Sequence, residues 1–139
     1  MTGEQTAVVE RYLALLFDPA ATSARLADLL HDDVVFVEHP NQVSPQGSRR
    51  DRSALLASFE AGRRLMAEQR LDDLEVLPAG DYVVARAAWS GTLAVDAAPL
   101  RAGSTLRARL AMFFTVRDGR VFRQENYDCY EPLPVAGDA

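Results

Sequence analysis

Alternation of apolar and polar residues with a period of two runs through the second half of this chain. It occupies four segments, residues 71–77, 82–95, 106–117 and 120–130. Because successive side chains of a strand point to opposite faces of a sheet, this period is typical of strands with one buried face. The dipeptide Asp118-Gly119 favours a tight type I′ hairpin, and residues 78–81 form another turn. The pattern therefore predicts four consecutive strands in an antiparallel sheet.

The first half of the chain predicts three helices and one short strand. Apolar residues at helical spacing mark a helix over residues 2–18, a shorter helix that Ser23 caps, and a third helix ending near residue 66 with Ser48 or Asp51 as its cap. Residues 34–38 are β-branched and aromatic, which favours a strand. Pro40 ends this strand because proline has no backbone N–H to donate. Residues 41–48 are expected to form a loop.

Composition and charge limit the kind of protein. A chain of 139 residues has the usual size of one domain, which we expect to span residues 1–132 with residues 133–139 as a loose tail. The net charge of −5 argues against nucleic acid, and no apolar run is long enough to span a membrane. Every basic side chain is arginine, so lysine-based covalent catalysis is excluded. Cys129 is the only cysteine and the N-terminus lacks a secretory pattern, so we expect a cytoplasmic protein.

Several short motifs resemble one known family. They are Arg11-Tyr12, Val37-Glu38-His39-Pro40, Asp118-Gly119-Arg120-Val121 and residues 125–132. Together with the order of the elements, they resemble the SnoaL-like polyketide cyclase and ketosteroid isomerase-like branch of the nuclear transport factor two-like superfamily. The resemblance implies a cone-shaped α+β barrel, in which three helices pack in a strongly curved, mainly antiparallel sheet around a cavity. It also implies a homodimer, which apolar residues on the outer face of the sheet favour as well.

The resemblance implies three catalytic candidates, and each has a structural alternative. His39 matches the catalytic carboxylate of ketosteroid isomerases and can transfer protons near neutral pH, or it is a strand-end histidine bonded to a backbone carbonyl. Asp128 matches the acid/base aspartate of the cyclases, or it is a structural acid paired with an arginine such as Arg109. Tyr12 matches the tyrosine that stabilises an oxyanion in the isomerases, or it is a core residue.

Other residues are expected to form the pocket or its surroundings. Alternation places Asn126 and Asp128 on one face of the last strand and Cys129 on the other, where we expect a small buried apolar group. Ala111 stands where the isomerases carry a second acid. The candidates for substrate binding are Asn126, Trp89, Arg109, Phe113 and Phe59. The arginines at 49, 50 and 52 are most simply a solvated helix start, although they could attract an anionic part of a substrate.

Two hypotheses for function follow. The first is a cofactor-free acid/base enzyme, a cyclase, isomerase or dehydratase, that acts on a largely apolar, carbonyl-bearing substrate. The second is a binding protein that holds a small apolar ligand in the same cavity without turnover, which the absence of an acid at Ala111 favours. No metal site is expected, because the only two histidines, His31 and His39, would need several carboxylates beside them.

Overall fold

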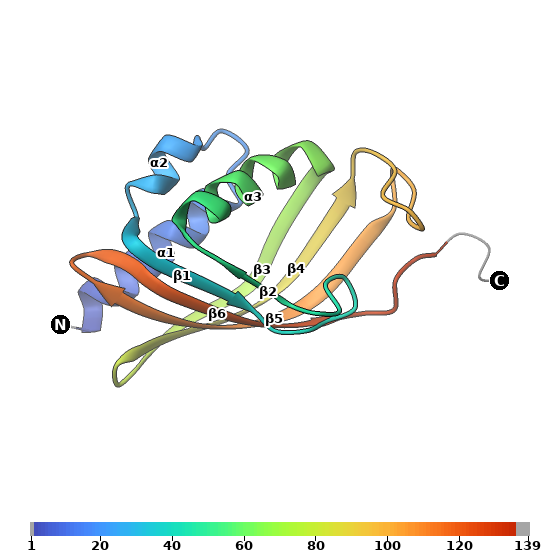
Figure 1. Ribbon diagram of the computed structural model, residues 1–139. Helices are drawn as coiled ribbons and strands as arrows, with labels where there is room; N and C mark the ends of the chain where they lie inside the picture. Colours follow the sequence, from blue (N-terminus) through green and yellow to red (C-terminus); the bar gives the residue numbers. More distant parts are fainter. Residues whose placement is uncertain (1, 136–139) are drawn as a thin grey trace.

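Three helices lie against one curved sheet of six strands in the computed structural model, which describes residues 2–135 (Figure 1). The helices are α1 (Thr2–Leu16), α2 (Ser23–Ala27) and α3 (Arg52–Leu65). The strands are β1 (Leu30–Glu38), β2 (Ser48–Arg50), β3 (Met66–Ala79), β4 (Tyr82–Leu93), β5 (Thr105–Arg117) and β6 (Arg120–Tyr130). The predicted α+β class is confirmed.

The order of the strands across the sheet is β2-β1-β6-β5-β4-β3. Every neighbouring pair is antiparallel except β1 and β6, which run parallel, so the sheet is mainly antiparallel as predicted. The four strands expected from the two-residue period are β3 to β6. Asp118 and Gly119 both have positive φ, 54° and 70°, as a type I′ turn between β5 and β6 requires.

The boundaries in the first half of the chain differ from the prediction. β1 begins at Leu30 rather than at residue 34, β3 begins at Met66, and Thr22 instead of Ser23 caps α2. Asp51 caps α3 and accepts a hydrogen bond from the Ala54 N–H at 2.9 Å. β2 was not predicted, because its three residues are polar and its strand character comes only from pairing with β1 at the edge of the sheet.

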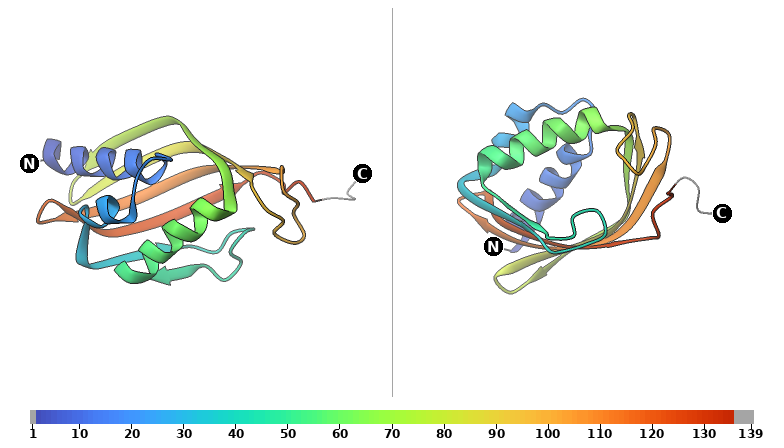
Figure 2. Two further views of the ribbon diagram at one scale, coloured as in Figure 1. Left: turned by 90° about the horizontal axis from the view of Figure 1, so that it is seen from above. Right: turned by 45° about the vertical axis from the view of Figure 1, so that its right-hand side comes forward.

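The sheet curls around the helices, with α1 and α3 on its concave side (Figure 2). Part of this curvature comes from β3, where the register with β4 shifts between Asp72 and Glu75, and Asp73 has a φ of 55°. An extra residue at such a bulge bends the strand and increases its twist. The main core fills the concave side, and its largest fully buried side chains include Tyr12, Leu13 and Phe114.

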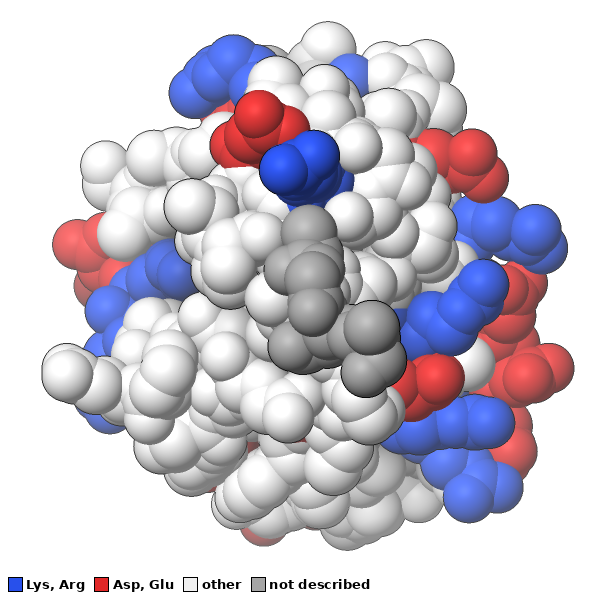
Figure 3. Space-filling view, turned by 90° about the vertical axis from the view of Figure 1, so that its right-hand side faces the viewer, with Lys and Arg blue, Asp and Glu red and all other residues white. Residues whose placement is uncertain are grey.

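A smaller apolar cluster closes the end of the molecule that carries the loop between β4 and β5. It consists of Leu93, Leu100 and Leu106, and Leu133 and Val135 pack against it. The first part of the expected C-terminal tail therefore contacts the fold, and residues 136–139 lie outside the described residues. Seen from this end, charged side chains gather most densely at the right-hand margin, and smaller groups lie at the top and the left (Figure 3).

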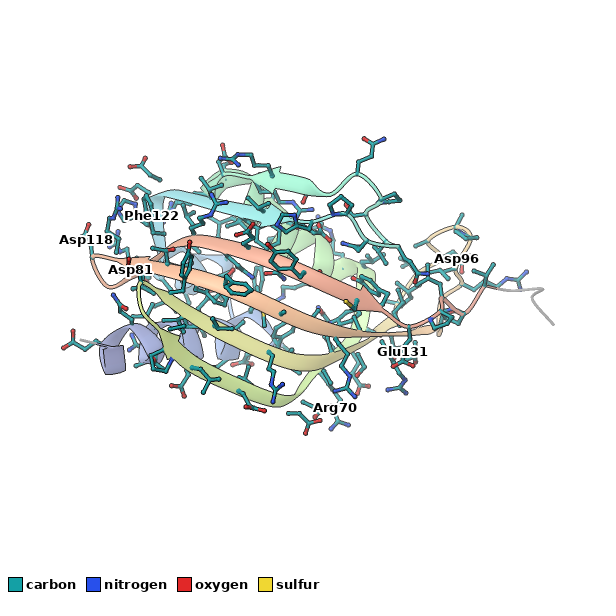
Figure 4. The ribbon with its side chains drawn as sticks, turned by 90° about the horizontal axis from the view of Figure 1, so that it is seen from below. Arg70, Asp81, Asp96, Asp118, Phe122 and Glu131 are labelled. Carbon is teal, nitrogen blue, oxygen red and sulfur yellow. The ribbon has the colours of Figure 1, made fainter. Side chains whose placement is uncertain are left out.

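The outer face of the sheet has no helix over it within residues 2–135 (Figure 4). Tyr82 and Tyr127 are 49% and 44% exposed there. Within the same residues, no helix is long and apolar enough to cross a bilayer.

Candidate functional site

A cavity of about 210 Å³ lies between the three helices and the inner side of the sheet. Its apolar wall consists of Leu16, Phe17, Leu26, Phe36, Leu55 and Phe59. Its polar lining includes Tyr12, Arg50, Arg63, Gln69, Gln124 and Asn126. Three predicted site residues, Tyr12, Phe59 and Asn126, therefore line one cavity. The volume suits a molecule of one or two rings, since an engineered cavity of about 150 Å³ binds benzene.

A chain of hydrogen bonds runs along the inner face of β6. The Tyr12 hydroxyl donates to Gln124 Oε1 at 3.0 Å, and Gln124 Nε2 donates to Asn126 Oδ1 at 2.9 Å. Asn126 Nδ2 then donates to Asp128 Oδ1 at 3.3 Å. The three β6 side chains meet because residues two apart on a strand share a face. Each amide nitrogen carries two N–H groups and uses one in this chain, which leaves the second for a ligand.

Asp128 ends this chain and is the next inward-facing residue after Asn126. The pKa of Asp128 is raised from 3.8 to about 6, first by burial and then by the charge of Glu38, and the hydrogen bond from Asn126 opposes both effects. Among residues 2–135, Asp128 forms no ion pair. A carboxyl group with such a pKa is mostly ionised at pH 7 and can accept a proton there.

Glu38 is a site residue that the sequence analysis did not identify. It lies beside Asn126 in the parallel register of β1 and β6, and its side chain is 12% exposed. Ser48 Oγ and Asn41 Nδ2 each donate to its carboxylate at 3.0 Å, and Arg50 Nη1 lies 3.8 Å away. Val34 and Phe36 on the same strand are buried, and alternation from them turns Glu38 inward. Residues 34–37 are all apolar, so the sequence alone does not show which of them face the core.

The structure does not bring His39 to Asp128. His39 Nε2 lies 2.7 Å from Glu125 Oε2, and its ring stacks on Tyr127 with the centroids 4.3 Å apart. Glu125 and Tyr127 alternate with the inward residues of β6, so His39 lies on the outer face. The hydrogen bond from His39 holds the pKa of Glu125 below its usual value.

The remaining substrate-binding candidates, Trp89, Arg109 and Phe113, lie outside the cavity lining. Trp89 is outside the cavity lining but donates through Nε1 to Oε1 of Gln69, a lining residue, at 3.1 Å. Arg109 and Phe113 alternate with the buried Leu110 and Met112, so they face outward. Phe113 packs edge-to-face on Tyr127 with the centroids 5.8 Å apart. This arrangement gives no support to a pocket role for Arg109 or Phe113.

Two further residues of the sequence analysis also lie on the outer face. Ala111 faces Tyr127 across β5 and β6 and lines an outer hollow together with Arg109 and Cys129. The lack of an acid at Ala111 therefore says nothing about the inner cavity. Cys129 points away from Asp128 as predicted, but it is exposed, so the expectation of a buried apolar group is wrong. Residues 2–135 contain no group of three or more His, Cys, Asp or Glu side chains that could hold a metal ion.

Comparison with known families and structures agrees with this fold. The family model for the SnoaL-like domain matches residues 9–124. No curated protein gives a significant match. Among solved structures, a proposed polyketide cyclase from Pseudomonas putida KT2440 is 24% identical, with a TM-score of 0.73 over 88% of this chain and 89% of that one.

Two other solved structures have the same fold. A proposed polyketide cyclase from Xanthomonas campestris pv. campestris is 22% identical, with a TM-score of 0.76 over 94% of this chain and 92% of that one. A protein with a ketosteroid isomerase-like fold from Catenulispora acidiphila, solved in complex with trimethylamine, is 16% identical, with a TM-score of 0.66 over 86% of this chain and 83% of that one. At these identities the likeness establishes the fold and does not assign a reaction.

Proposed function

Because the chain belongs to the SnoaL-like domain family, we propose that it binds a small, largely apolar, carbonyl-bearing molecule in the inner cavity. In this proposal Asp128 removes a proton from the molecule and returns one to it, and no cofactor takes part. The observation that carries the proposal is the hydrogen-bond chain from Tyr12 to Asp128, which ends on a carboxyl group with a pKa of about 6. A general base works best when its pKa lies close to the working pH.

The proposed step begins with a ligand whose carbonyl oxygen accepts hydrogen bonds from the free N–H groups of Gln124 and Asn126. The Asp128 carboxylate removes a proton from the carbon next to this carbonyl. The electron pair of the broken C–H bond forms the C=C bond of an enolate, and the negative charge on oxygen is held by the two amide N–H groups. The protonated Asp128 then gives its proton back: to another carbon of a conjugated enolate in isomerisation, to the oxygen formed when the enolate carbon attacks a second carbonyl in cyclisation, or to a neighbouring hydroxyl group that leaves as water in dehydration.

Tyr12 has an indirect role in this proposal. Its phenol is buried and its proton is directed at Gln124 Oε1, so Tyr12 orients the amide that meets the ligand. Burial raises the pKa of Tyr12, so the phenol stays protonated and remains a donor. The oxyanion role predicted for Tyr12 thereby passes to Gln124 and Asn126.

Deuterium exchange tests the proposal without knowledge of the true substrate. One- and two-ring ketones such as cyclohexanone and 1-indanone are incubated with the protein in D₂O, and NMR follows deuterium incorporation next to the carbonyl. We expect exchange above the buffer rate, and a loss of about 10²- to 10⁴-fold in Asp128→Asn. Exchange that is equal in the two proteins would contradict the catalytic role of Asp128.

The alternative is a binding protein without turnover. It is favoured by the position of Asp128, which lies beyond the residues that line the cavity. The same experiment separates the two functions. A binder would show chemical-shift changes at Gln124 and Asn126 on addition of ketone, with exchange no faster than in buffer.

We also propose a homodimer through the outer face of the sheet. Four rings form an outer aromatic group there: Tyr82 of β4, Phe113 of β5, Tyr127 of β6 and His39, which follows β1. Each ring contacts the next in this order. A second copy of the same face would remove these rings from water, and closed twofold pairs are the commonest assemblies of soluble proteins. The cytoplasmic location stays a prediction that rests on the single cysteine.

A further inference from the structure

Two arginines of the cavity have no part in the proton transfer described above. Arg50 comes from β2 and Arg63 from the last turn of α3. The lining contains these two cations and, among residues 2–135, no aspartate or glutamate. Two other arginines near the start of α3 behave differently, because Arg49 is exposed and Arg52, the first residue of the helix, donates to the backbone oxygens of Leu30 and Ala27.

Each lining arginine lies over a phenylalanine of the apolar wall. The Arg50 guanidinium carbon is 5.4 Å from the ring centroid of Phe36, and that of Arg63 is 5.1 Å from the ring centroid of Phe59. β1 and β2 supply one pair, and α3 supplies the other. A ring bound against these phenylalanines would therefore have a guanidinium within reach of its edge.

The two arginines differ in charge balance. Arg50 has the Glu38 carboxylate 3.8 Å away, which offsets its charge. Arg63 donates to the backbone oxygen of Pro19 and contacts Phe59, and it forms no ion pair within residues 2–135. The nearby Asp18 carboxylate instead accepts the Ala20 N–H at 2.8 Å. Arg63 is thus the uncompensated positive charge of the cavity.

Arg63 also lies where the cavity meets the surface. A second hollow of about 270 Å³, formed by the residues after α1 and the start of β3, shares Leu16, Phe17, Arg63 and Gln69 with the cavity lining. Arg63 is therefore open to both spaces, and the carboxylates of Asp18 and Glu68 line only the outer hollow. Of the five N–H groups of a guanidinium, the bond to Pro19 uses one, so most of the planar fork is free for a ligand.

We propose that the ligand of this cavity is a cyclic or aromatic acid with one carboxylate, which Arg63 binds, while its carbonyl end reaches Gln124 and Asn126. This inference rests on the proposed function, since it names the class of molecule that the cavity takes. A guanidinium matches a carboxylate with two parallel hydrogen bonds. One uncompensated cation balances one negative charge, whereas a phosphate would bring nearly two.

The test compares an acid with its neutral isostere. 4-Acetylbenzoate and 4-acetylbenzamide are titrated into the wild type, Arg63→Gln and Arg64→Gln, with affinity from calorimetry and the site from NMR shifts of Gln124 and Asn126. Arg64 is the matched control, because it follows Arg63 in the same turn of α3 but is exposed and outside the lining. Melting curves verify that all three proteins are folded.

We expect the wild type and Arg64→Gln to bind the acid at least tenfold more tightly than the amide. Arg63→Gln should bring the two affinities to within about threefold and leave that of the amide unchanged. Equal affinities in the wild type, or the same loss in both variants, would overturn the inference but leave the cavity as a ligand site. If neither compound binds, the proposed function fails and this inference fails with it.

Discussion

Replacement of Asp128 by asparagine separates a catalytic acid from a structural one. The change keeps the size of the side chain and its bond from Asn126, but it removes the charge. A pKa raised from 3.8 to about 6 corresponds to about 3 kcal/mol against the ionised form. Since Asp128 is partly exposed, solvent screens this effect, and we expect Asp128→Asn to stabilise the fold by about 1 to 2 kcal/mol at neutral pH.

The sign of the pH dependence of stability follows from the direction in which the pKa of Asp128 is shifted. An acid whose pKa is higher in the folded state destabilises the fold wherever it is ionised in both states, that is, above about pH 6. This destabilisation shrinks as the pH falls from about 6 to 3.8 and is absent below that. The stabilising effect of Asp128→Asn should therefore be full at pH 8 and lost at pH 3.5.

Thermal melts of the wild type and Asp128→Asn at both pH values measure the effect. For a domain of this size we expect the melting temperature of the variant to be about 3 to 8 °C higher at pH 8, and equal to that of the wild type at pH 3.5. Asp81→Asn is the control, because Asp81 is exposed in the turn before β4 and forms no ion pair within residues 2–135. A variant that melts several degrees lower at pH 8 would show that Asp128 is structural and would refute the reasoning.

Three other substitutions test separate parts of the structure. Burial raises the pKa of Asp128 most and the charge of Glu38 adds to it, so Glu38→Gln should move the acidic limb of the exchange rate against pH to lower pH. Gly91→Ala places a Cβ 2.6 Å from the Trp89 ring, so the tryptophan fluorescence should change and the free energy of unfolding should fall by about 1 to 3 kcal/mol in a denaturant titration. Unchanged fluorescence would argue against this packing. Tyr127→Arg puts a charge into the outer aromatic group and should turn a dimer into a monomer in sedimentation, whereas an unchanged mass would exclude this face as the interface.

Sequence patterns were sufficient for β4, β5 and β6 because these long strands are specified locally. A period of two over ten or more residues fixes both the strand and its buried face, and Asp118-Gly119 fixes the turn that joins β5 to β6. β2 could not be found in this way. Its three polar residues form a strand only because β1 offers a free edge, and that edge exists only after the chain has folded.

The position of Glu38, the second carboxylate of the site, shows that a local motif match can be wrong by one residue. Similarity to the isomerase segment drew attention to His39, yet the side chain that reaches the inner face of β1 is that of Glu38. Parity decides between them: Val34 and Phe36 are buried against the core, so the residue two further along also points inward and its neighbour points outward. The same argument moves Arg109 and Phe113 to the outer face, since Leu110 and Met112 occupy the inner one. In a strand, an error of one residue in a motif match therefore moves the predicted side chain from the cavity to the outer face. The burial of the flanking residues shows more reliably which side chains can contact a ligand.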